Sequence, residues 1–109
     1  MDNLPAVKEG KTNAIISYLT IIGTIVAFVL NNSRKNPFAS FHIRQMIGLN
    51  IIYILNQTII YNIFGLIAFW IIGAITIVLW FIGFMGVLKG EKRPVPIFGE
   101  HFQEWFNSI

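Results

Sequence analysis

Few side chains in this sequence can carry out acid–base, nucleophilic or metal chemistry, and those few are scattered along the chain. The two histidines, His42 and His101, stand 59 positions apart and cysteine is absent, so a metal site lacks ligands. No serine stands in a nucleophile-elbow context, and no glycine-rich phosphate loop is present. Residues 12–33 and 45–88 contain no Asp, Glu, Lys or Arg, which leaves no carboxylate for a proton relay. We therefore expect no catalytic residue, no cofactor and no metal.

Polar side chains suited to binding are concentrated in the segment 37–61. At about 100° per residue they fall on one arc of a helix. The set consists of His42, Gln45, Asn50, Tyr53, Asn56, Gln57 and Tyr61. Amides and phenols are costly to place against hydrocarbon, so they must meet neighbouring helices, a partner or water. Three interpretations stay open: hydrogen bonding within a helical bundle, a water-accessible groove or partner surface, and a ligand site.

Two other segments each carry a face of small residues. In 13–31 this face includes Thr20 and Thr24. In 64–89 it includes Gly83 and Gly86, and Gly90 completes a GxxxG spacing with Gly86. Because small residues let helix backbones approach closely, we expect these faces to pack inside one bundle. An interface with a partner helix is the alternative.

The elements that position these residues follow from composition. The chain has 109 residues, of which 55% are hydrophobic and 12% charged, and its two uncharged segments hold 22 and 44 residues. About 20 apolar residues at 1.5 Å each cross a hydrocarbon core of about 30 Å, so one span fits the first segment and two fit the second. We predict an all-α integral membrane protein, a single helical membrane domain over 1–109 with three transmembrane helices at 13–31, 37–61 and 64–89.

The ends of these helices also have sequence signals. The apolar run 14–30 is longer than the core of a signal peptide and lacks a small-residue cleavage site, so we expect a retained helix. Asn36 and Pro37 supply an N-cap and a first helical position. After residue 89, Pro94 and Pro96 exclude helix. Aromatic residues then recur at helical spacing over 98–108, which predicts a C-terminal amphipathic helix lying in the membrane interface.

Charge predicts an orientation in the membrane. The formal net charge is +3, and the basic residues flank apolar segments, which favours anionic lipid headgroups over nucleic acid. The residues expected at headgroups are Arg34, Lys35, Arg44, Lys92, Arg93 and Trp105. With three spans, six of the eight Lys and Arg residues share a side with the C-terminus, and Lys8 and Lys11 lie on the other. The positive-inside rule then predicts a multi-pass protein with a cytoplasmic C-terminus and its N-terminus outside.

Three segments resemble a known family. They read YLTIIGTIVAFVLN at 18–31, NPFASFHIRQMIGLNIIYIL at 36–55 and KGEKRPVPIFG at 89–99. Over most of its length the chain resembles the small bacterial membrane family known as import component proteins, which is similar to the Tic-twenty subunit of the chloroplast protein import complex. Phe41, His42 and Gln45 carry the match, together with the Lys-Gly-Glu…Pro segment. The resemblance implies a non-enzymatic helical subunit of a complex in the bacterial inner (plasma) membrane, and assigns those three residues no role.

Three functions are compatible with these features. The first is an accessory subunit of an inner-membrane protein translocation or insertion complex, which docks partner helices through small and polar intramembrane faces. The alternative is a homo-oligomeric pore or small-solute transporter lined by the polar arc. A third is a lipid-binding or membrane-stress protein that uses its basic residues. Expected partners are membrane lipids and a larger integral membrane protein complex, with no nucleic acid and no identified small-molecule substrate.

Overall fold

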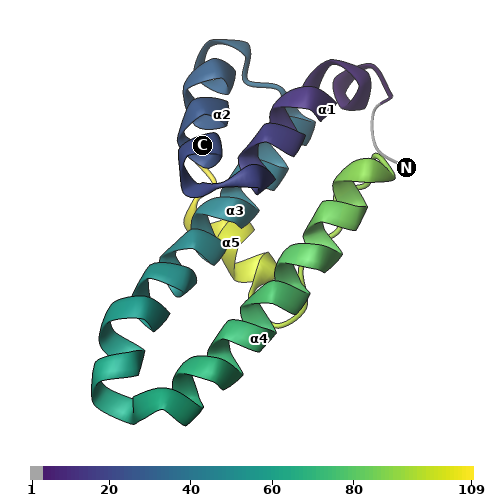
Figure 1. Ribbon diagram of the computed structural model, residues 1–109. Coiled ribbons are helices and arrows are strands. Elements are labelled where there is room, and N and C mark those ends of the chain that lie inside the picture. Colours follow the sequence, from purple (N-terminus) through teal and green to yellow (C-terminus); the bar gives the residue numbers. More distant parts are fainter. Residues whose placement is uncertain (1–3) are drawn as a thin grey trace.

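The computed structural model describes residues 4–109, and this part of the chain is all-helical, as predicted. The elements in order are α1 (Leu4–Leu19), α2 (Ile21–Arg34), α3 (Pro37–Leu55), a short π-helix η1 (Asn56–Ile60), α4 (Tyr61–Leu88) and α5 (Gly99–Trp105). Figure 1 shows α3 and α4 as the two limbs of a long hairpin, with α1 and α2 packed against one half of it. The other half, which contains the hairpin turn, extends beyond α1 and α2.

The long hairpin is one helical stretch that folds back on itself. Pro37–Leu88 has 52 residues, which as a straight helix would be about 78 Å long, whereas the longest dimension of the molecule is 46 Å. The reversal occurs at Gly65, whose φ of 87° and ψ of −171° are open only to glycine. The reversal therefore lies close to the predicted boundary between the helices 37–61 and 64–89. The sequence did not predict η1, a π-helical turn just before it.

Pro37–Leu88 is also the one helical stretch among residues 4–109 that is long and apolar enough to span a membrane. An 18-residue segment of this stretch has a mean hydropathy of 2.5, and only 22% of that segment is buried inside the protein. Three separate spanning helices are not confirmed, because the first predicted span is divided. α1 and α2 have 16 and 14 residues, which gives lengths of about 24 and 21 Å, too short to cross hydrocarbon alone.

The division of the first predicted helix, 13–31, occurs at Thr20. The backbone there is extended (φ −155°, ψ 174°), and the Thr20 hydroxyl accepts a hydrogen bond from the Gly23 N–H at 3.0 Å, which caps α2. We call residues 18–22 the elbow. α2 then lies so close to α1 that a Cβ on Gly23 would be 2.3 Å from the carbonyl oxygen of Ile16. A side chain at position 23 would therefore force the elbow open.

The core lies where α1, the first half of α3, the end of α4 and α5 meet. Its buried members include Tyr18, Phe38, Val87 and Phe102. Phe102 of α5 is seated directly on α3, because a Cβ on Gly48 would lie 2.4 Å from its ring. The apolar side of the tail, predicted to lie on lipid, is thus partly occupied by the chain itself.

Candidate functional site

A buried polar network joins three separate parts of the chain. The Tyr18 hydroxyl of α1 donates to Nδ1 of His42 on α3 at 2.8 Å, and Nε2 of Gln45 donates to the same hydroxyl at 2.9 Å. His42 and Gln45 are fully buried, and Tyr18 is 1% exposed. The network continues into the segment after α4, where His42 Nε2 bonds the Glu91 carbonyl at 2.9 Å and the Val95 N–H donates to Gln45 Oε1 at 2.8 Å.

Both ring nitrogens of His42 have hydrogen-bond partners in this arrangement. Nε2 faces the carbonyl oxygen of Glu91, which only accepts, so Nε2 carries a hydrogen and donates. In the neutral tautomer with its hydrogen on Nε2, Nδ1 accepts from the Tyr18 hydroxyl, so this tautomer satisfies both bonds. The bonds join protein groups to one another across long sequence separations. The network therefore holds the connector 89–98 against α1 and α3, and the two regions that carry the family resemblance meet here.

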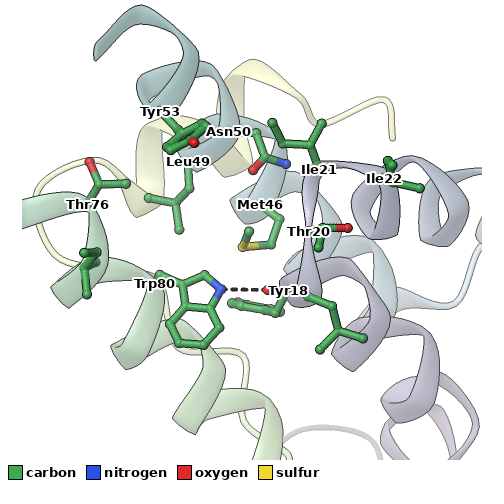
Figure 2. Close-up of a pocket in the computed structure, with 12 residues that line it drawn as sticks. Tyr18, Thr20, Ile21, Ile22, Met46, Leu49, Asn50, Tyr53, Thr76 and Trp80 are labelled. Atoms are coloured by element: carbon green, nitrogen blue, oxygen red, sulfur yellow. Dashed lines mark hydrogen bonds between the residues drawn. The ribbon is translucent and has the colours of Figure 1, made fainter. Parts of the chain in front are cut away.

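A pocket of about 630 Å³ opens below the elbow, between α3 and α4. Figure 2 shows Thr76 and Trp80 of α4 on one side, Thr20, Ile21 and Ile22 of the elbow on the other, and α3 side chains between them. The α3 side chains are Met46, Leu49, Asn50 and Tyr53. Trp80 closes one end by donating its indole N–H to the Tyr18 carbonyl at 2.8 Å. The lining is mainly apolar, and its polar groups come from all three elements.

A second pocket of about 390 Å³ lies further toward the hairpin turn, between η1 and α4. Tyr53, Thr76 and Ile77 line both pockets, so the two pockets adjoin each other along the α3–α4 hairpin. We call the two adjoining pockets together the hairpin groove. Asn56 also lines it, on the side where Gly73 of α4 has no side chain. The groove therefore presents carboxamide, phenol and hydroxyl groups along a largely apolar surface.

Asn56 has an unmet hydrogen-bonding group. The residue is 2% exposed, and its Nδ2 donates to the Phe69 carbonyl at 3.1 Å. Since a carbonyl oxygen only accepts, this bond fixes the amide orientation and leaves Oδ1 as the second group. Oδ1 is buried without a donor. An acceptor of this kind costs about 1–3 kcal/mol in the isolated chain.

The residues of the predicted polar arc have different surroundings along α3 and η1. His42 and Gln45 belong to the buried network. Asn50 donates to the Thr24 hydroxyl at 2.8 Å, which ties α3 to the elbow side of α2. The arc continues into the hairpin groove with Tyr53, Asn56 and Gln57, and Tyr61 packs edge-on against Phe69.

The residues of the predicted small-residue faces contact other parts of the same chain. Thr24 is buried and its hydroxyl donates to the Ser17 carbonyl at 2.7 Å, whereas Thr20 caps α2 at the exposed elbow. Gly83 lies against the Tyr18 hydroxyl, where a Cβ would be 2.8 Å away. Gly86 faces the connector through its carbonyl, which accepts from Glu91 N–H at 2.8 Å as Gly90 ends α4.

The predicted headgroup residues gather near the start of α3. Lys35, Arg44 and Lys92 line one shallow pocket. Arg44 also holds the tail, because its Nη2 donates to the Asn107 carbonyl at 3.1 Å. Arg93 pairs with Glu91 at 3.0 Å, and Arg34 and Trp105 are exposed. The sequence did not indicate the contact between Arg44 and the tail.

Within residues 4–109 no three His, Cys, Asp or Glu side chains are grouped so as to hold a metal ion. The candidate site is the hairpin groove, where α3, η1 and α4 bring polar side chains together along an apolar lining. No family model, curated protein or solved structure matches the chain. The resemblance to the import component proteins stays a prediction.

Proposed function

We propose that this chain is an integral membrane protein and a non-enzymatic accessory subunit of a protein translocation or insertion complex. The α3–α4 hairpin lies in the bilayer, and the hairpin groove docks a transmembrane helix of a larger partner. The observation that carries the proposal is the groove itself. It places polar side chains along a hairpin whose large exposed side chains are mainly apolar.

Exposure along the hairpin supports the membrane setting. Large apolar side chains face outward on both limbs and at the turn, including Ile63, Phe64, Ile67 and Trp70, each at least 65% exposed. A patch of this extent is unfavourable in water and matches hydrocarbon. Each limb of the hairpin is also long enough to cross a hydrocarbon core of about 30 Å.

The polar groups of the groove support a helix as the occupant. Hydrocarbon tails offer no hydrogen bond to the accessible polar side chains of the groove, Asn50, Tyr53 and Gln57. A neighbouring transmembrane helix with Ser, Thr or Asn side chains supplies donors and packs against the apolar lining. Because Gly83, Gly86 and Thr24 are buried inside the chain, the hairpin groove takes over the docking role considered for the small-residue faces.

Site-specific photo-crosslinking tests this proposal at native expression level. The photoreactive amino acid benzoylphenylalanine replaces Tyr53, which lines the groove, or Phe81, which is exposed on α4 outside it. Both positions are aromatic and similarly exposed, at 47% and 56%, so they form a matched pair. We expect a defined adduct with one component of a translocation or insertion complex from position 53 and none from position 81.

Other adducts distinguish the alternatives. A crosslink between two copies of this chain from position 53 would favour the homo-oligomeric pore, in which the groove faces another protomer. Equal, diffuse crosslinking from both positions would contradict a docking groove. Extraction of the protein by alkaline carbonate would contradict the membrane setting.

A further inference from the structure

The two ends of the α1–α2 pair lie at the same end of the molecule. Nζ of Lys11 on α1 donates to the Leu88 carbonyl at the end of α4, at 2.9 Å. Nδ2 of Asn36, in the connection from α2 to α3, donates to the Ala6 carbonyl at 2.9 Å. Figure 1 shows the start of α1, the end of α2 and the end of α4 together at one end, opposite the hairpin turn.

The basic residues follow this arrangement. Arg34 shares a pocket with Glu9 of α1, and Lys35 and Arg44 share another with Lys92 of the connector. The remaining Lys and Arg residues lie at the start of α1 and just after α4, in the same region. All eight Lys and Arg residues of the chain therefore lie at one end, and the 44 uncharged residues 45–88 form the rest of the hairpin.

The elbow stops partway along the hairpin. Asn50, which bonds Thr24 beside the elbow, is 14 residues beyond Asn36, or about 21 Å along α3. The turn at Gly65 is 29 residues beyond Asn36, or about 43 Å. The α1–α2 pair therefore reaches about half the length of the hairpin before it returns.

The exposed side chains and backbone hydrogen bonds of the elbow suit a hydrocarbon environment. Its large outward side chains are apolar, with Leu19 62% and Ile22 73% exposed, and the exposed Thr20 uses its hydroxyl to cap α2. Two of the carbonyls at the helix break have side-chain donors: Thr24 Oγ1 donates to Ser17 O at 2.7 Å, and Trp80 Nε1 donates to Tyr18 O at 2.8 Å. Broken helices are tolerated at membrane depth when their backbone groups are satisfied in this way.

We propose that α1 and α2 form a re-entrant hairpin, which enters and leaves the bilayer through the same face. The start of α1, the C-terminal end of the chain and all eight basic side chains then meet the anionic headgroups of one leaflet, and only the turn of the α3–α4 hairpin reaches the other face. The positive-inside rule places the charged face in the cytoplasm. This inference rests on the proposed membrane setting and replaces the external N-terminus expected from three spans.

Cysteine accessibility tests the topology, and the chain has no native cysteine to mask. Thr12→Cys in α1, Ser33→Cys at the end of α2 and Asn62→Cys at the hairpin turn are single substitutions at exposed polar positions. Each variant is labelled with a membrane-impermeant maleimide in inside-out and right-side-out vesicles. A fourth variant, Leu19→Cys, reports on the elbow.

We expect positions 12 and 33 to label only in inside-out vesicles and position 62 only in right-side-out vesicles. Position 19 should label only after detergent is added. Labelling of positions 12 and 33 from opposite faces would overturn the re-entrant hairpin and restore a full span over 13–31, with the membrane setting intact. Release of the protein by alkaline carbonate would instead overturn the proposed function itself.

Discussion

The side chain of Gln45 accepts a hydrogen bond from the backbone N–H of Val95, fifty positions later in the chain, at 2.8 Å. Val95 is 2% exposed and Gln45 is fully buried, so this bond is shielded from water. It fixes the path of the connector that leads from α4 to α5. The segment after the hairpin is thereby positioned by a residue near the start of the hairpin.

Replacing Gln45 by Leu should release the connector. The substitution leaves the Val95 N–H without its acceptor and removes a donor to Tyr18, at a cost of about 1–3 kcal/mol. We expect a lower thermal unfolding temperature in mild detergent and faster proteolysis within residues 91–98. Gln57→Leu is the control, since Gln57 is exposed. Equal unfolding temperatures for the two variants would show that the network contributes nothing to stability.

Gly83 and Gly73 should respond differently to alanine. A Cβ at position 83 would lie 2.8 Å from the Tyr18 hydroxyl, whereas one at position 73 would lie 3.5 Å from Asn56 Nδ2, an ordinary contact. Overpacking costs about 1–3 kcal/mol, and alanine otherwise favours helix over glycine by about 1 kcal/mol. Gly83→Ala should therefore lower the unfolding temperature and Gly73→Ala should leave it equal or higher. The opposite order would refute the close packing of α4 on α1.

The elbow depends on the Thr24 hydroxyl. Thr24→Val keeps the shape of the side chain but removes the bonds to Ser17 O and from Asn50 Nδ2, and we expect a loss of about 1–3 kcal/mol in stability. Thr58→Val is the matched control, because Thr58 bonds only its own helix, at Ile54 O, and is exposed. Thermal denaturation in detergent compares the two. A loss no larger than that of the control would mean that the elbow does not need this hydroxyl.

The tail is held by Phe102. Phe102→Ala removes a ring that is 3% exposed and seated on Gly48, with a cost of about 3–5 kcal/mol where the site does not collapse. We expect the segment after residue 98 to become sensitive to protease while the hairpin stays intact. Trp105→Ala, at a position 63% exposed, should leave the tail protected. Greater cleavage in the Trp105 variant would indicate that lipid or a partner, rather than α3, holds the tail.

Sequence alone was enough to predict the helical class, the helix start at Asn36–Pro37 and the boundary between the helices 37–61 and 64–89, which lies close to the turn at Gly65. These features depend on local chemistry: side-chain periodicity, an N-cap followed by proline, and a glycine free to adopt positive φ. The sequence also identified Gln45 and Asn56 as polar residues that need partners. Their partners, Val95 and Phe69, lie on other elements and were not specified by spacing.

The position of the break in the first predicted helix, 13–31, could not be predicted from the sequence. The small polar face from Ser17 to Asn31 keeps helical periodicity straight through Thr20, so the pattern is the same for one helix or two. The break is favoured because Trp80 and Thr24 donate to two of the carbonyls at the break and because Gly23 lets α2 approach α1. The same holds for Arg44, whose contact with Asn107 depends on where α5 packs. Long-range packing sets these features, and local propensity does not contain that information.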